Sequence, residues 1–235
     1  MTTPKPEIGK LLTEAYQYWM RTLPFQFLFS VIYFSVTMFA DSYAFRYYGL
    51  FEEVQKFQNL FYSDFEGFMT KLEVLMQTPN GKLFAVVALI VKAVIFPLNL
   101  GFLKIYRKLD IGEKLNTSDL FAGFRGHYFF LFVIYSFVWS IINNYLSIFT
   151  FIWIPMMLFV PALIFYKGFN FLKSFQISIQ TFQKYFILIF VATIVSILFS
   201  YCGFIMFFFG IFLTFPFWNA MIYVLYKHLI ADFDE

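Results

Sequence analysis

The sequence predicts an all-α integral membrane protein, and three observations lead to this class. Hydrophobic residues make up 61% of the chain and charged residues only 13%, whereas a typical soluble domain has about 25% charged residues. Uncharged runs of membrane length recur along the chain. Amphipathic stretches that end in a basic residue precede several of these runs. This composition excludes a soluble globular protein.

The membrane spans follow from the uncharged runs, because a bilayer core about 30 Å thick requires about 20 apolar residues. The runs 128–166 and 185–226 are each too long for one span and suitable for two. Asn143 and Asn144 mark a turn in the first run, and Cys202-Gly203 lies near the middle of the second. The sequence therefore predicts six spans, at residues 23–40, 83–103, 128–146, 148–166, 185–202 and 204–226.

The basic residues predict the orientation, because Lys and Arg near the ends of spans stay in the cytoplasm. One alternating set of loops holds only Arg46, Lys56, Lys71 and Lys82. The opposite set holds Lys5, Lys10, Arg21, Lys104, Arg107, Lys108, Lys114, Arg125, Lys167, Lys173, Lys184 and Lys227. Both termini are therefore expected in the cytoplasm. Residues 1–22 contain no isolated apolar core, so we expect no cleavable signal and a retained first span.

A threefold pattern runs through the predicted spans. Amphipathic stretches at 8–21, 120–125 and 171–184 precede the first, third and fifth spans and fit interfacial helices. Each returning span carries a proline, Pro97, Pro155 or Pro216, about ten residues before a Tyr-basic pair. The pattern predicts three helical hairpins whose proline kinks free backbone carbonyls around a central cavity. The alternative is that the prolines and Tyr-basic pairs are ordinary features of membrane helices.

The segment 41–81 is an insertion between the first two spans, on the side opposite the termini. Apolar residues at helical spacing predict two amphipathic helices within it, near 50–61 and 65–76, with a helix breaker at 78–81. This helical insertion would either cover the bundle and dip into the outer leaflet, or provide a docking surface for other envelope proteins.

The rare polar residues inside the spans are the candidates for a ligand site. Lys92 lies in the middle of the second span, where a charge costs at least about 2.5–3.5 kcal/mol and usually faces a cavity or a partner. No acidic residue lies within a predicted span to neutralise it, which disfavours a proton-coupled carboxylate relay. The candidate cavity residues are Lys92, Asn99, Asn143, Asn144 and Asn219.

The sequence offers little material for enzymatic chemistry. Arg125 and His127 are expected at the cytoplasmic interface, but no catalytic, metal-binding or cofactor-binding motif surrounds them. The two histidines and single cysteine lack the spacing of a metal site. The net charge of +3 is explained by membrane topology, so nucleic acid is not an expected partner.

Three stretches resemble a bacterial multi-span family of unknown function. They are the loop ending in Asp119-Leu120-Phe121-Ala122-Gly123-Phe124, the stretch 161–168 and the stretch 174–185. Relatives of that family form the membrane domain attached to some glycerophosphodiester phosphodiesterases. The resemblance covers most of the chain except 41–81 and implies no phosphodiesterase activity, because the soluble catalytic domain has no counterpart here.

Three function classes remain open from the sequence. The first is a non-enzymatic scaffold or envelope assembly factor in the bacterial inner membrane, acting through its interfacial helices and the 41–81 insertion. The second is a transporter or lipid-binding protein with a cavity around Lys92. The third is a lipid-modifying enzyme using Arg125, His127 and Asp119 at the cytoplasmic face. Membrane lipids are the expected partners in every class.

Overall fold

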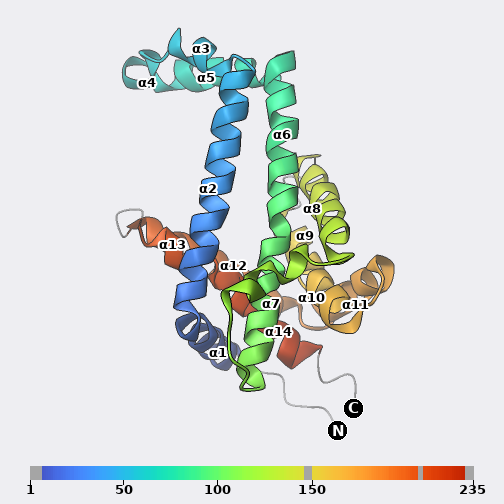
Figure 1. Cartoon of the computed structure of the whole chain (residues 1–235). Coiled ribbons are helices and arrows are strands. Elements are labelled where there is room, and N and C mark those ends of the chain that lie inside the picture. Colours follow the sequence, from blue (N-terminus) through green and yellow to red (C-terminus); the bar gives the residue numbers. More distant parts are fainter. Residues whose placement is uncertain (1–6, 146–149, 206–208, 231–235) are drawn as a thin grey trace.

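The computed structural model describes residues 7–145, 150–205 and 209–230, which form α-helices and 3₁₀ turns without a strand. Two long helices, α2 (Leu23–Tyr47) and α6 (Pro79–Ile95), stand side by side and carry three short helices at one end (Figure 1). We call the three short helices the cap, and α2 from residue 31 together with α6 the stalk. The base comprises the other described elements, with residues 23–30 of α2.

Four segments of the described chain are long and apolar enough to cross a membrane. A fifth is added if the bent pair of η2 (Thr117–Phe124) and α8 (Tyr128–Tyr145) forms one broken span. The chain is therefore an all-helical, multi-pass membrane protein. The four segments are α2; α6 with η1 (Phe96–Leu98) and α7 (Asn99–Asp110); α9 (Thr150–Met157) with α10 (Val160–Lys167); and α12 (Phe186–Cys202) with η4 (Gly203–Ile205).

Helix α2 is longer than the predicted first span. It continues beyond residue 40 to Tyr47, so Asp41 follows the predicted span 23–40 within the same apolar helix. One carboxylate oxygen of Asp41 is buried without a hydrogen-bond partner among the described residues.

The predicted sixth span is not one continuous helix in the described chain. It is divided into η4, α13 (Ile211–Thr214) and α14 (Phe217–Leu229), and its residues 206–208 lie outside the described ranges. Pro216 precedes α14 and lacks the N–H that a continuing helix would use. The six-span arrangement stays a prediction. Asn143 and Asn144 are helical, because α8 continues through both residues, and the turn between the predicted spans 128–146 and 148–166 lies outside the described residues.

Amphipathic elements precede the first, third and fifth predicted spans. Two are helices, α1 (Ile8–Arg21) and α11 (Phe171–Lys184). Helix α1 buries a mostly apolar face, whereas α11 buries two serines and a threonine together with Phe182. The third is the 3₁₀ segment η2, which begins with a capping box formed by Asn116 and Asp119. The Asn116 side chain accepts a hydrogen bond from the Ser118 N–H and so caps the N-terminus of this segment.

The cap consists of α3 (Leu50–Gln55), α4 (Leu60–Ser63) and α5 (Phe65–Gln77), in place of the two helices predicted there. It projects sideways from the end of the stalk (Figure 1). Asp64 caps α5 by accepting a hydrogen bond from the Gly67 N–H at 2.9 Å. Thr78 caps α6 in the same way, and Pro79 occupies the first turn, where a missing N–H costs nothing.

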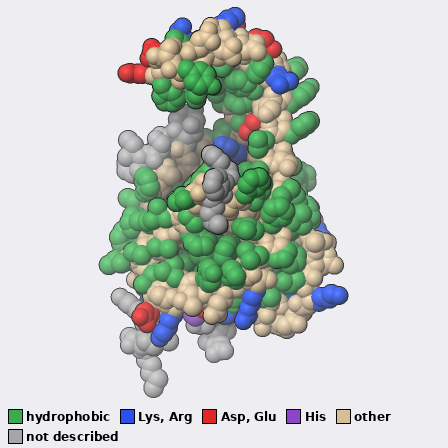
Figure 2. All heavy atoms as spheres, turned by 90° about the vertical axis from the view of Figure 1, so that its left-hand side faces the viewer, with side chains coloured by type: hydrophobic (Ala, Val, Ile, Leu, Met, Phe, Trp, Pro, Cys, Tyr) green, Lys and Arg blue, Asp and Glu red, His purple; other side chains and the backbone are tan. Residues whose placement is uncertain are grey.

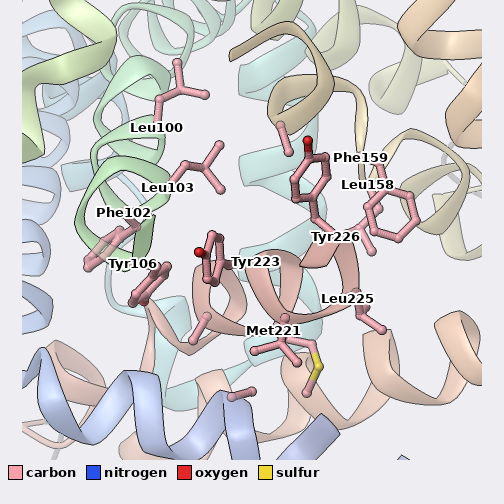
Figure 3. Packing of buried hydrophobic residues seen from close by; sticks show 14 of the residues in the cluster. Leu100, Phe102, Leu103, Tyr106, Leu158, Phe159, Met221, Tyr223, Leu225 and Tyr226 are labelled. Carbon is pink, nitrogen blue, oxygen red and sulfur yellow. The ribbon is translucent and has the colours of Figure 1, made fainter. Parts of the chain in front are cut away.

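The core of the base forms around α14, which packs against α1, α7 and α12. Figure 3 shows Tyr223 and Tyr226 of α14 near Phe102 and Tyr106 of α7 and Phe159 before α10. Gly101 of α7 lets η2 approach closely, because a Cβ there would lie 2.2 Å from the Leu120 carbonyl oxygen. The base is therefore fixed by both side-chain and backbone contacts.

Candidate functional site

Two of the predicted polar residues meet at a small cavity inside the base. The Asn219 side-chain amide donates a hydrogen bond to the Asn99 side-chain oxygen at 3.2 Å. The Asn99 amide in turn donates to the backbone carbonyl of Phe96 at 3.0 Å. Both asparagines line a cavity of about 140 Å³, together with Phe96, Leu100, Leu103, Tyr135, Trp139, Ile154, Met157, Leu158, Pro161, Trp218 and Ile222.

Each of the three predicted kink prolines lies within three residues of this cavity wall. Pro97 follows Phe96 in η1, Pro155 follows Ile154 in α9, and Pro216 immediately precedes α14. The break between α9 and α10 is bridged by Ser178 of α11, whose hydroxyl donates to the Met156 carbonyl at 2.6 Å and accepts from the Phe159 N–H at 3.3 Å. The interrupted helices thus bring three segments that are distant in sequence to one cavity.

A larger apolar cavity adjoins the first. It has a volume of about 410 Å³ and lies among α8, α9, α10 and α11. Tyr135, Trp139 and Met157 line both cavities and form their common wall. The remaining lining residues are Leu131, Ile134, Val138, Ile142, Trp153, Ile164, Phe171 and Phe175.

The indole N–H of Trp153 is the polar exception in the larger cavity. The Trp153 ring stacks on Trp139, with 5.8 Å between ring centroids. Its Nε1 atom is buried and has no hydrogen-bond partner among the described residues. A buried indole N–H usually finds an acceptor, and none of the described residues supplies one to Trp153.

The two cavities together suit an uncharged amphiphile. The lining residues of both include amides, a phenol and indoles, but no charged side chain. A charged group would be buried there without an ion partner, at a large cost in free energy. An apolar chain in the larger cavity, and a neutral hydrogen-bonding group near Asn99 or Trp153, would satisfy the walls.

The other predicted cavity residues lie elsewhere. Lys92 is exposed on the stalk part of α6 and does not line either cavity. Asn143 has a buried side-chain oxygen without a hydrogen-bond partner among the described residues. The side chain of Asn144 lies outside the described part of the chain. The candidate site is therefore centred on Asn99 and Asn219.

The three residues considered for an enzyme do not form a shared contact. Asp119 has a side chain only 2% exposed and makes ion pairs with Lys104 and Lys108, each at 2.9 Å. Burial alone would raise the pKa of Asp119, but hydrogen bonds from the two lysines and from the Asn116 N–H lower it overall. Arg125 and His127 are exposed, and His127 lies against the Tyr128 ring. Asp119 therefore fastens η2 to α7.

A polar network joins α1, α7 and α14 at the end of the base, and sequence reasoning missed it. Lys227 contacts Glu14 at 3.1 Å, the Tyr18 hydroxyl at 2.9 Å and Asp110 at 3.4 Å. Asp110 accepts hydrogen bonds from Tyr18 and Tyr223. Burial, helped by Asp110, raises the pKa of Tyr18 to about 12. The only signal was the four-residue spacing of Glu14 with Tyr18 and of Tyr223 with Lys227, which places each pair on one helix face.

Comparisons with known proteins leave the fold and site without a named relative. No family model matches the chain, and no curated protein or solved structure matches it significantly. The fold and site define a multi-pass helical membrane protein with a cavity in its base that Asn99 and Asn219 line.

Proposed function

We propose that this protein is a non-enzymatic membrane protein that binds an uncharged membrane lipid in the paired cavities of the base. The observation that carries the proposal is the apolar cavity with its unpartnered Trp153 N–H, next to the cavity that holds Asn99 and Asn219. This is the lipid-binding class expected from the sequence, with the site at the two asparagines instead of Lys92.

The chemistry of the walls selects the ligand. Aromatic and aliphatic side chains would hold an acyl or isoprenoid chain through burial of apolar surface. The Trp153 N–H and the asparagine amides would then meet ester, hydroxyl or ketone groups. Asn99 lies five residues from Lys104, about 7.5 Å along the helix, so the polar group would sit a short distance inside the membrane surface.

The test adds a photoactivatable diacylglycerol to detergent-purified protein. Phosphatidylglycerol with the same photoactivatable chain represents the charged lipids in a parallel experiment. Diacylglycerol should label residues of α8 or α11 more strongly than phosphatidylglycerol. Met157→Trp should reduce the labelling by filling the common wall. Asn99→Leu should reduce it about tenfold, the effect of losing about 1.4 kcal/mol of hydrogen bonding.

Asn59→Leu provides the matched control, because Asn59 is an exposed asparagine that precedes α4 in the cap. Its labelling should equal that of the unmodified protein. Unchanged labelling in both Met157→Trp and Asn99→Leu, with normal thermal unfolding, would refute the site. Equal labelling by the two lipids would refute the preference for an uncharged ligand.

A scaffold role is the second candidate, and the acidic residues of the cap favour it. Glu52, Glu53, Glu66 and Glu73 are exposed there and could pair with a basic envelope protein. Cross-linking in cells should capture such a partner with the unmodified cap and lose it in Glu66→Gln/Glu73→Gln, while Lys71→Gln retains it. Full cellular function after removal of the cap would contradict this role.

The distribution of basic residues also supports a proposal for the cellular location of the protein. We place the protein in the bacterial cytoplasmic membrane with both termini inside, supported by the concentration of Lys and Arg in one set of loops. Reporter fusions at the C-terminus and in the cap should report opposite sides. The relation to the membrane domain of glycerophosphodiester phosphodiesterases is likewise a proposal, supported by the loop around Asp119 that fastens η2 to α7.

A further inference from the structure

The apolar stripe of α5 is covered at one end and bare at the other. Phe65, Phe68, Met69, Leu72, Leu75 and Met76 follow the helical spacing of one face. Near the stalk, Leu75 is 9% exposed, whereas Met69 and Phe65 at the far end are 47% and 58% exposed. The stripe therefore extends beyond any surface that the described residues provide to cover it.

Aromatic side chains enlarge the bare end of the stripe. Phe61 of α4 lies 5.7 Å from Phe65 and 5.4 Å from Phe68, measured between ring centroids. The neighbouring Tyr62 is 91% exposed. Glu66 and Glu73 flank the stripe on one side of α5, and Lys71 flanks it on the other. The result is an amphipathic element with an aromatic underside.

Figure 2 shows how this element is turned relative to the molecule. Hydrophobic side chains gather on the underside of the cap, and charged side chains lie along its rim and upper edge. An open hollow separates the underside from the lower part of the molecule. The bare apolar surface thus faces along the stalk, toward the base.

The surface of the stalk continues this apolar underside. Met38, Phe39, Tyr43 and Tyr47 of α2 are exposed, at 67%, 78%, 65% and 73%. They belong to a helix that is long and apolar enough to cross a membrane, so lipid is their natural surrounding. Tyr43 and Tyr47 near its end fit the aromatic belt of the interface.

We infer that the underside of the cap rests on the bilayer, with Phe61, Phe65 and Met69 inserted among the lipid headgroups of the leaflet on that side. Continuity with the lipid-facing surface of α2 indicates lipid as the occupant. An apolar stripe flanked by charged residues has the form of an interfacial helix. The hollow below the cap then contains lipid of that leaflet.

The experiment measures the surroundings of single spin labels on the cap. Cys202 is the only cysteine, so Cys202→Ser gives a background for Phe65→Cys and Met69→Cys. Glu66→Cys and Glu73→Cys, on the charged flank of the stripe, are the matched controls. Each labelled protein is placed in vesicles of phosphatidylethanolamine and phosphatidylglycerol, and collisions with oxygen and with a water-soluble nickel chelate are compared.

Labels at residues 65 and 69 should shift toward oxygen, which concentrates in lipid, while labels at 66 and 73 should favour the nickel chelate. Equal access of the chelate to all four labels would overturn the inference in favour of a water-exposed cap. Exclusion of both reagents from residues 65 and 69 would overturn it in favour of a protein partner, and spin–spin coupling between labels would identify that partner as a second copy.

Discussion

The base and the stalk contrast most clearly along the single helix α2. Within the base α2 buries Gln26, Phe29 and Ser30, whereas within the stalk it buries only Ala44. The base also contains the buried helix α14 and the ion-paired Asp119. One helix therefore serves as core element at one end and as lipid-facing element at the other, so equal substitutions should have unequal effects in the two regions.

The strongest test of this contrast is Gly101→Ala in the base. The new methyl group would overlap the Leu120 backbone, with its Cβ 2.2 Å from the carbonyl oxygen, and neither chain segment can move without breaking other contacts. We expect a loss of more than about 3 kcal/mol in the free energy of unfolding, measured by denaturant titration in detergent micelles. Gly9→Ala is the control, since a methyl group there meets no atom within 4 Å. If the two variants are equally stable, the backbone contact between Gly101 and Leu120 does not fix the base.

Asp119→Asn should have the next largest effect. Removing one partner of a buried ion pair costs about 3 kcal/mol, here at the lower end because Lys104 and Lys108 can turn toward water. The denaturant titration is repeated at a series of pH values. The folded state lowers the pKa of Asp119, so its contribution is present above the unfolded pKa of about 3.9 and is lost as pH falls below that value. If stability falls at acidic pH to the same extent in Asp119→Asn as in the unmodified protein, this assignment is wrong.

Asp64→Ala in the cap should have a smaller effect. It removes the hydrogen bond that the Asp64 side chain accepts from the Gly67 N–H at the start of α5. The loss should cost about 1 kcal/mol of local helix stability. Hydrogen exchange should become faster in α5 and stay unchanged in α14. A loss of protection in α14 would show that the cap and the base unfold as one unit.

Phe39→Ala on the stalk should have the smallest effect. The side chain is 78% exposed, and substitution of such a residue usually changes stability by less than about 0.5 kcal/mol. Phe102→Ala is the comparison in the base, where the side chain is fully buried and truncation costs about 3–5 kcal/mol. Equal losses in the two variants would show that another protein surface covers the stalk.

The sequence anticipated features that depend on neighbours along the chain. The apolar runs predicted the segments that are long and apolar enough to cross a membrane, and Pro97 and Pro216 lie at breaks between helices, because a missing N–H acts within one helical turn. Pro155 lies inside α9, before the break from α10. The neighbourhood of Asn99 and Asn219, 120 residues apart, depends on how helices distant in sequence pack. Lys92 was expected near them, but an uncharged run gives little periodicity from which to tell the lipid face from the core face. Asp119 read as a loop acid, although Lys104 and Lys108, one helical turn apart, were suitable partners.

The contact between Gly101 and Leu120 also has an evolutionary consequence. A position where even a methyl group overlaps main-chain atoms has no acceptable substitution while the fold is kept. Among descendants of this gene, glycine should persist at residue 101 even where the lipid-facing positions of the stalk have exchanged one apolar residue for another. In an alignment of diverged relatives, this glycine would therefore be a better marker of common ancestry than the more abundant phenylalanines.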